Sequence, residues 1–173
     1  MLYSIHGPYE IPRQNTVVDR SAEALTDLWQ EIEDNYEGLP EGCGCYLFAL
    51  RAGKGITPWY VGVAEKQSFQ RECFSPHKIS IYNDVLDEWK GTPLLYLVAR
   101  NTPEARFSAP SRRGHPSARY LELILISRAM EKNPELMNKR DTKLLRDMVV
   151  PTILNSPPGR RTLDEEEFLL ALQ

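Results

Sequence analysis

The sequence lacks the features of secreted and membrane proteins. Its 173 residues include only three cysteines, an odd number and too few for a disulfide framework. No apolar run approaches the length that crosses a bilayer. The first residues also lack the basic stretch and apolar stretch of a secretory leader. These absences predict a reduced, cytoplasmic protein without membrane contact.

Positive charge is also scarce. The chain has 21 Lys and Arg against 24 Asp and Glu, which gives a formal net charge of −3. Nucleic-acid-binding domains usually carry a basic surface, so any such activity here must depend on a local patch. The 42% hydrophobic and 26% charged residues are typical of a folded globular protein. The length suits one domain with a small extension.

Apolar periodicity and breaker residues predict a mixed fold. Residues 1–20, which include Pro8 and Pro12, are expected to be irregular, and a helix capped by Ser21 is expected over 21–36. The other expected elements are strands over 43–50, 58–63 and 92–100, helices over 65–74, 75–91 and 117–132, an edge strand over 148–154, and a last helix capped by Thr162 and Glu165. The order predicts an α/β (α+β) fold with a small, mostly antiparallel central sheet flanked by helices.

Basic residues gather in two places. The loop over 101–116, "NTPEARFSAPSRRGHP", has three prolines and three arginines, and loops of this length are usually functional or disordered. If the basic side chains share the face of a site, they could contact a nucleic-acid backbone; if they are spread out, they are ordinary solvated charge. The candidates are Arg106, Arg112, Arg113, Lys139, Arg140, Lys143, Arg160 and Arg161.

Glu122 stands out in the expected helix over 117–132. At about 100° per residue it lies away from the charged side of that helix, among apolar neighbours. A carboxylate on an apolar face is costly unless a cation, a hydrogen-bond network or a metal compensates its charge. Two interpretations remain open: a border position that pairs with Arg119 or reaches water, or a functional carboxylate that holds a hard divalent cation.

Two expected strands each carry a tyrosine beside a glycine. The first contains Gly44-Cys45-Tyr46 and the second contains Tyr60-Val61-Gly62, with a Gly-rich loop between them. A hairpin does not require this pair of triplets. With Arg71 on the next helix, Glu122 on an apolar helix and Asn138 after it, residues 43–158 resemble the GIY-YIG nuclease superfamily in the order of their motifs.

The resemblance implies a metal-dependent endonuclease and assigns a role to each residue. Glu122 would bind Mg²⁺ or Mn²⁺, and Arg71 would hold the phosphate with its planar guanidinium. One tyrosine would take the proton of the attacking water, with Tyr46 preferred, and Tyr60 would position the water or the phosphate. A nearby cation would favour the phenolate. Without the other motif residues, both tyrosines would be read as core aromatics.

Two further residues are candidates. His77, near the start of a helix, could bind the phosphate or shuttle a proton, and a surface histidine is an equal interpretation. Asn138 could organise the site through hydrogen bonds or could serve as a turn residue. The expected domains are an N-terminal extension with one helix over 1–42 and a GIY-YIG-like domain with the C-terminal helix over 43–173.

Three functions are compatible with these residues. The first is an endonuclease acting on nucleic acid, with DNA expected and a protein partner for targeting possible. The second is a catalytically inactive GIY-YIG-like module that binds nucleic acid or protein. The third is a thiol enzyme using Cys73 and His77. A zinc site at the cysteines is disfavoured, because Cys43 and Cys45 lack the paired Cys-x-x-Cys spacing of zinc ribbons.

Overall fold

The computed structural model describes residues 2–139, 142–154, 156 and 158–172. Its contacts divide the chain into two compact units, residues 1–137 and residues 138–173. The boundary expected after residue 42 does not coincide with this division, because the N-terminal residues supply a strand to the central sheet of the first unit.

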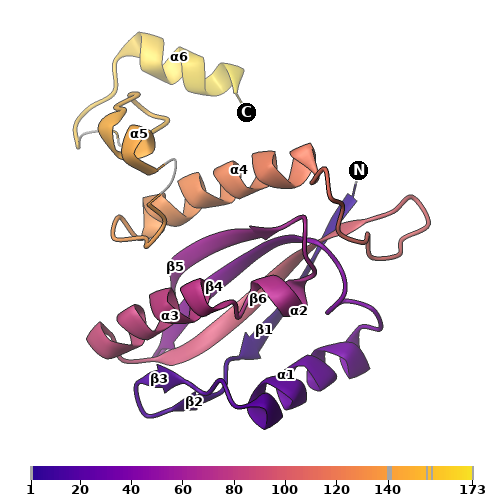
Figure 1. Ribbon diagram of the computed structural model, residues 1–173. Coiled ribbons are helices and arrows are strands. Elements are labelled where there is room, and N and C mark those ends of the chain that lie inside the picture. The colour runs from indigo at the N-terminus through magenta and orange to yellow at the C-terminus, as the bar shows by residue number, and fades with distance from the viewer. Residues whose placement is uncertain (1, 140–141, 155, 157, 173) are drawn as a thin grey trace. The chain divides into compact units, whose positions relative to one another are not determined.

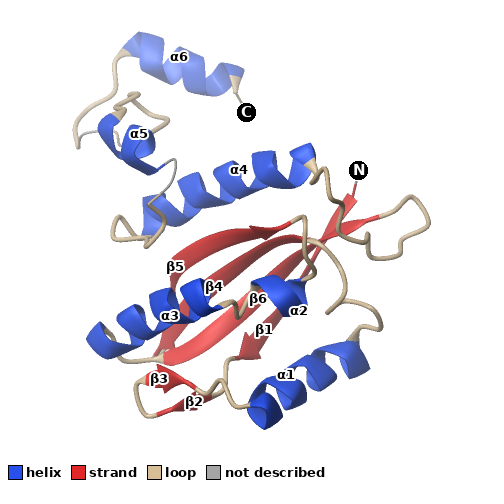
Figure 2. Cartoon of the chain, in the orientation of Figure 1, coloured by secondary structure: helices blue, strands red, loops and turns tan. Residues whose placement is uncertain are grey.

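The first unit has a four-stranded sheet at its centre (Figures 1 and 2). The strands are β1 (Leu2–Glu10), β4 (Gly44–Ala52), β5 (Gly55–Ala64) and β6 (Thr92–Asn101). Their order in the sheet is β1-β6-β4-β5, and every pairing is antiparallel. Helices flank this sheet. The predicted fold class, an antiparallel sheet flanked by helices, is therefore confirmed.

Strand β1 corrects the sequence-based expectation for residues 1–20. It pairs with β6 from Leu2 opposite Asn101 to Glu10 opposite Leu94, with a bulge between His6 and Tyr9. Pro8 had indicated irregular structure, but it lies in this bulge on an edge strand, where a proline is tolerated. A small hairpin follows, formed by β2 (Arg13–Gln14) and β3 (Val17–Val18).

Helix α1 (Ala22–Asn35) forms where it was expected. The Ser21 side chain accepts a hydrogen bond from the Ala24 amide and caps the helix. Its buried residues, Leu28, Trp29 and Ile32, recur at helical spacing and join the main core. The N-terminal helix therefore packs on the core of the first unit.

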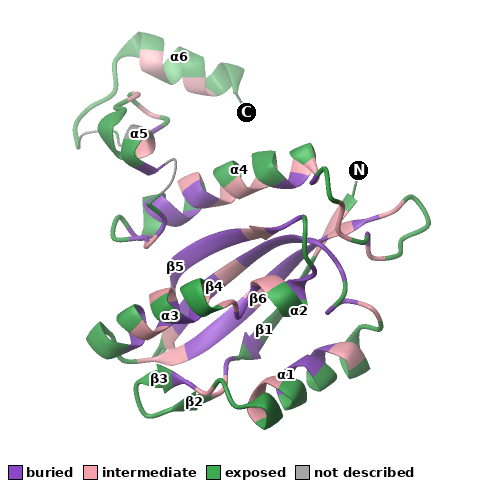
Figure 3. Ribbon diagram, viewed as in Figure 1, coloured by how far each residue is buried: buried purple, intermediate pink, exposed green. Residues whose placement is uncertain are grey.

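Helices α2 (Phe69–Glu72) and α3 (Pro76–Glu88) cover the same face of the sheet as α1 (Figure 3). Helix α2 is much shorter than the predicted helix over 65–74. Ser75 precedes Pro76 and has extended backbone angles, with φ −60° and ψ 153°. Because a residue before proline is disfavoured in the α region, α2 ends before this point and α3 begins after it.

Helix α4 (Pro116–Lys132) packs on the other face. The Cys45 thiol donates a hydrogen bond of 3.2 Å to the Ala118 carbonyl. Phe48, which points to the opposite face from Cys45, stacks on Tyr82 of α3 with ring centroids 4.2 Å apart. The sheet thus lies between α4 and the group of α1, α2 and α3. In the described part of the chain, no helix is long and apolar enough to cross a membrane.

The second unit contains α5 (Thr142–Asp147) and α6 (Leu163–Ala171). The predicted capping box is confirmed: Thr162 accepts from the Glu165 amide, and the Glu165 carboxylate accepts from the Thr162 amide. The prediction of an edge strand over 148–154 is wrong. Only a bridge joins Val150 to Leu154, because the residues between them turn, with Thr152 at φ 67°.

The two motif triplets lie side by side in the β4–β5 ladder. Tyr46 is opposite Gly62, so the Tyr46 ring crosses the strand at the position where a side chain would otherwise stand. A Cβ added at Gly62 would overlap the Cζ and Oη atoms of Tyr46. The glycine of the second triplet therefore makes room for the tyrosine of the first.

We expect Gly62→Ala to destabilise the protein by about 1–3 kcal/mol, because the buried Tyr46 ring cannot move aside without strain. Gly55→Ala, in the same strand, is the matched control, since its new Cβ would meet the Ala52 carbonyl oxygen at an ordinary 3.6 Å. Urea unfolding of both variants measures the difference. Equal stability of the two would contradict the close packing of Tyr46 on Gly62.

His6 of β1 is a buried titratable group away from the motif. Its ring packs edge-on against Tyr36 and Phe107, with centroids 4.4 and 5.3 Å away, and its Nε2 lies 2.8 Å from Ser4 Oγ. Burial lowers the pKa of His6 below its usual 6.5. The unfolded chain therefore binds a proton at His6 at a higher pH than the folded chain does.

This shift predicts that His6 makes stability fall as pH drops. The contribution is complete above pH 6.5 and is lost as pH falls from 6.5 through the lower folded-state pKa. Urea unfolding at pH 7.5 and at pH 5 measures how much free energy of unfolding each protein loses on acidification. This loss should be smaller for His6→Asn than for wild type, and His77→Asn is the control at an exposed histidine. An equal loss of unfolding free energy in all three proteins would rule out His6 as the cause of the pH dependence.

Candidate functional site

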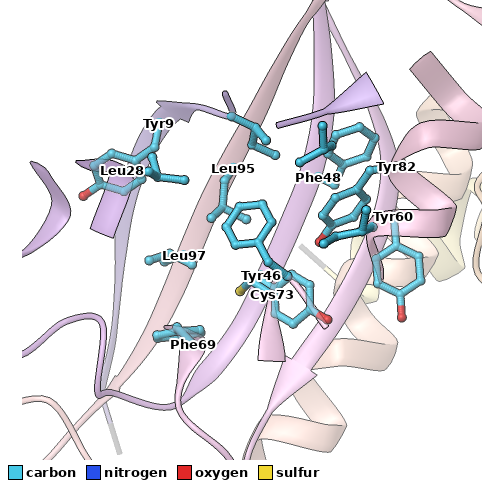
Figure 4. Close-up of a cluster of buried hydrophobic side chains, with 14 of the residues drawn as sticks. Tyr9, Leu28, Tyr46, Phe48, Tyr60, Phe69, Cys73, Tyr82, Leu95 and Leu97 are labelled. Atoms are coloured by element: carbon cyan, nitrogen blue, oxygen red, sulfur yellow. The ribbon is translucent and has the colours of Figure 1, made fainter. Parts of the chain in front are cut away.

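Tyr46 and Tyr60 point to the same face of the sheet, toward α3 (Figure 4). Tyr60 pairs with Phe48, and Pro58 pairs with Ala49, so Trp59 is the extra residue of a bulge. The ring centroids of the two tyrosines are 6.3 Å apart. The hairpin thus brings the two motif tyrosines together.

The two tyrosines differ in their surroundings. Tyr46 is 0% exposed, and its hydroxyl has no hydrogen-bond partner among the described residues. Burial, reinforced by Tyr82, raises the pKa of Tyr46 well above 10. The Tyr46 phenolate is therefore strongly disfavoured in this arrangement, which argues against the preferred assignment of Tyr46 as the base.

Tyr60 has a cationic partner that the sequence pattern did not reveal. The Lys78 ammonium of α3 donates a hydrogen bond of 2.5 Å to Tyr60 Oη, and it lies 4.7 Å from the centroid of the Tyr60 ring. The Lys78 side chain is only 13% exposed. An ammonium group can only donate, so the Tyr60 oxygen is the acceptor. Lys78 thus fixes the orientation of the Tyr60 hydroxyl.

Glu72 of α2 completes this group. Its Oε1 lies 3.9 Å from Lys78 Nζ. Burial raises the pKa of Glu72 above its usual value, while the positive charges of Lys78 and His77 act in the opposite direction. His77 is exposed, in the first turn of α3, and Arg71 is exposed beside Glu72. The α2–α3 junction therefore places Glu72 and Lys78 beside Tyr60, and Arg71 and His77 are exposed on the same two helices.

A third tyrosine belongs to this cluster. Tyr82 of α3 is completely buried, its ring lies 6.4 Å from that of Tyr60, and its hydroxyl has no partner among the described residues. Burial raises the pKa of Tyr82 well above 10. The spacing of Lys78 and Tyr82, four residues apart on a helix, could have indicated that they share a face.

Glu122 occupies the buried side of α4. Its neighbours one turn away in each direction, Ala118 and Ile126, are buried, whereas Glu122 itself is half-buried. Burial raises the pKa of Cys45, which lies on the sheet face that α4 covers, and the negative charge of Glu122 raises this pKa further. The sequence was therefore right that Glu122 lies away from the solvent face.

Glu122 and the tyrosines approach β5 from its two sides. Helix α4 contacts β5 and β4 on one face, and α3 holds Lys78 against Tyr60 on the other. The structure thus places Glu122 and the two motif tyrosines on opposite faces of the sheet.

The remaining candidate residues are distributed between the two units. Arg112 and Arg113 are exposed in the loop before α4, in the first unit. The second unit contains the buried Asn138, whose carbonyl accepts a hydrogen bond of 2.6 Å from Thr142 Oγ1. It also contains the exposed residues Lys139, Lys143, Arg160 and Arg161. Arg140 lies outside the described residues.

The cysteines are packed as buried thiols. Burial raises the pKa of Cys43 to about 11 and the pKa of Cys73 well above 9. Cys73 is completely buried, whereas a reactive cysteine needs a lowered pKa and access to substrate. The thiol-enzyme interpretation thus has no support in this arrangement. Among the described residues, no group of three or more metal-ligating side chains is found.

We expect Tyr46→Phe to leave the free energy of unfolding unchanged or to raise it by about 1 kcal/mol. The change removes a buried hydroxyl without a partner among the described residues, so no hydrogen bond is lost. Tyr3→Phe is the contrast, because Tyr3 donates to Ser117 Oγ at 2.9 Å, and its loss should cost about 1 kcal/mol. Calorimetric unfolding compares the two. A large loss of stability in Tyr46→Phe would contradict the prediction.

The chain was also compared with protein-family models, curated proteins and solved structures, and none of them matched.

Proposed function

We propose that this protein is a metal-dependent endonuclease of the GIY-YIG type, cytoplasmic and acting on nucleic acid, with DNA as the expected substrate. The observation that carries the proposal is the hydrogen bond from Lys78 to Tyr60. The second motif tyrosine, Tyr46, lies close by, with its ring centroid 6.3 Å from that of Tyr60. A tyrosine held by a nearly buried cation, together with an exposed arginine on α2, supports hydrolysis of a phosphodiester.

Tyr60, rather than Tyr46, would act as the base. The ammonium charge of Lys78 compensates the negative charge of a Tyr60 phenolate. That oxygen would accept a proton from water as the water oxygen forms a bond to phosphorus. The bond from phosphorus to the leaving oxygen then breaks, and that oxygen takes up a proton from solvent. Arg71 would pair with the phosphate through its planar guanidinium.

Tyr46 and Tyr82 would pack beside Tyr60 and hold the site in place. Both rings belong to the core cluster on the α3 side of the sheet, and Phe48 stacks on Tyr82. This packing limits where Tyr60 and Lys78 can lie, which matters because catalytic groups must be held close to their productive geometry.

Glu122 would hold the metal ion. A single carboxylate suffices for Mg²⁺, which usually keeps several waters, so the lack of a larger ligand group in the described residues does not conflict with this choice. A half-buried carboxylate on the sheet-facing side of α4 fits such a site. When bound, Mg²⁺ or Mn²⁺ would supply a positive charge that polarises the phosphate.

The second candidate function is a non-catalytic module that binds nucleic acid or a protein partner. The burial of both motif tyrosines favours it, because Tyr46 is 0% and Tyr60 is 8% exposed, and a base that cannot reach water cannot assist hydrolysis. In that case the tyrosines would be packing residues of the hairpin. The two candidates make opposite predictions about turnover.

The test is cleavage of plasmid, linear duplex, branched DNA and single-stranded RNA, with Mg²⁺, Mn²⁺ or EDTA. We expect metal-dependent cleavage by wild type. Tyr60→Phe should reduce the rate about 10²–10⁴-fold, the usual contribution of a general base. Tyr46→Phe should reduce it much less, since the Tyr46 hydroxyl is buried. Glu122→Ala should abolish the metal-dependent activity.

Lys78→Met tests the cation, with Lys90→Met as the control, since Lys90 is exposed beyond the end of α3. Only Lys78→Met should reduce cleavage. If folded wild type cuts no better than folded Glu122→Ala under every condition, the endonuclease proposal fails and the binding module becomes the leading function. If Tyr46→Phe is the more damaging tyrosine variant, the roles of the two tyrosines are reversed.

A further inference from the structure

The loop before α4 has an unusual charge for this chain. Residues 106–119 contain four arginines and neither Asp nor Glu, although the whole chain has a formal net charge of −3. Arg119 is paired with Glu65, through a contact of 2.7 Å between Arg119 Nε and Glu65 Oε1. Arg112 and Arg113 are exposed, and neither forms an ion pair within the described part of the chain. This leaves two adjacent, uncompensated positive charges.

The two arginines are the central residues of a tight turn. The Gly114 amide donates to the Ser111 carbonyl at 2.8 Å and closes the turn. Gly114 has φ 72°, and an added Cβ there would lie 2.6 Å from Glu65 Oε2, so the turn lies directly against Glu65. Arg112 and Arg113 are therefore presented from a fixed backbone.

Glu65 holds this turn at both ends. Its carbonyl accepts from the Ser111 amide at 2.9 Å, and its Oε2 accepts from the His115 amide at 2.9 Å. Glu65 itself is only 8% exposed. A buried carboxylate is costly unless it is paired, and here all the described pairing goes to the turn and to the first turns of α4. Glu65 thus fixes the position of the arginine turn.

The turn is anchored at the C-terminal end of β5. Glu65 directly follows β5, the strand that carries Tyr60, and Arg71 follows six residues later on α2. A pair of fixed arginines at this end of β5 matches the chemistry of a phosphodiester backbone, which offers successive negative charges. Such contacts position a nucleic acid without reading its sequence.

We propose that the Ser111–Gly114 turn is a phosphate-backbone contact for nucleic acid, with Glu65 as its positioning residue. The proposal rests on the proposed function, because it takes the nuclease substrate as the ligand. It assigns Arg112 and Arg113 direct contacts and assigns Glu65 no contact with the ligand. The class of ligand is a nucleic-acid strand or duplex, held through its phosphates.

The experiment measures binding in EDTA, so that cleavage plays no part. Fluorescein-labelled DNA duplex, single-stranded DNA and single-stranded RNA are titrated at several salt concentrations. The double variant Arg112→Ala/Arg113→Ala should lower the slope of log K against log salt by about two, one for each lost phosphate contact. The control Lys54→Ala/Lys90→Ala removes the same charge at the other end of the sheet and should leave the slope unchanged.

Glu65→Ala distinguishes positioning from overall charge. Removal of a negative charge should strengthen binding if only net charge matters. The proposal predicts weaker binding, because the turn loses its anchor. Glu104→Ala removes an exposed carboxylate from the same loop and should bind as wild type or slightly tighter. Unfolding curves confirm that each variant is folded at the temperature of the titration.

The outcomes separate the two proposals. An equal decrease of the salt slope in the arginine and lysine double variants, or tighter binding by Glu65→Ala, would contradict the proposal that the turn contacts nucleic acid. Cleavage by wild type would still support the nuclease proposal in that case. Binding that depends on the turn, in a protein that cuts nothing, would support the contact and overturn the nuclease. Absence of binding to all three nucleic acids would overturn this inference, and cleavage would then be measured separately.

Discussion

The pairing of β4 with β5 is the constraint on which the candidate site depends. It sets Tyr46 opposite Gly62, and the absence of a side chain at Gly62 lets the Tyr46 ring lie across β5. The bulge at Trp59 follows in the same ladder and sets the position of Tyr60. A slip of one residue would turn Tyr46 toward α4 and separate it from Tyr60. Register therefore decides whether the two tyrosines form a pair.

The α3-facing side of this ladder combines apolar packing with one nearly buried cation. Tyr46 and Tyr82 place hydroxyl groups without described partners in the core, and burial raises the pKa values of both. Lys78 is the neighbour that gives Tyr60 a different environment. Three tyrosines within one cluster thus differ in chemistry because only one of them meets an ammonium group. This difference, rather than the motif alone, distinguishes Tyr60 as the candidate base.

Local patterns in the sequence identified most helices and three of the four strands of the central sheet, β4, β5 and β6. Helix α4 follows from a long apolar stretch after Pro116, and the cap of α6 follows from Thr162 and Glu165. Strand β1 was missed because its evidence is non-local: Leu2 pairs with Asn101, far along the chain, while Pro8 suggested a break. Long-range pairing of this kind leaves little trace in a short window of sequence.

The site was only partly accessible to the same reasoning. Two tyrosines, Arg71 and Glu122 could be named from motif order, and Glu122 from its helix face. The sequence left open whether Tyr46 is a core aromatic or an accessible base, because its burial depends on how α2 and α3 cover the sheet. Lys78 was missed because a lysine in the first turn of a helix is usually exposed, and only packing turns it inward onto Tyr60.

The bulge in β1 also has a consequence for the protein in concentrated solution. Strand β1 is one of the two edge strands of the sheet, and an edge strand offers backbone groups with which another chain can pair. Pro8 has no amide hydrogen, and the bulge at Gly7 and Pro8 interrupts the regular spacing of donors and acceptors. An incoming strand could therefore pair only with a short segment before the bulge, which disfavours the edge-to-edge stacking that leads to aggregation.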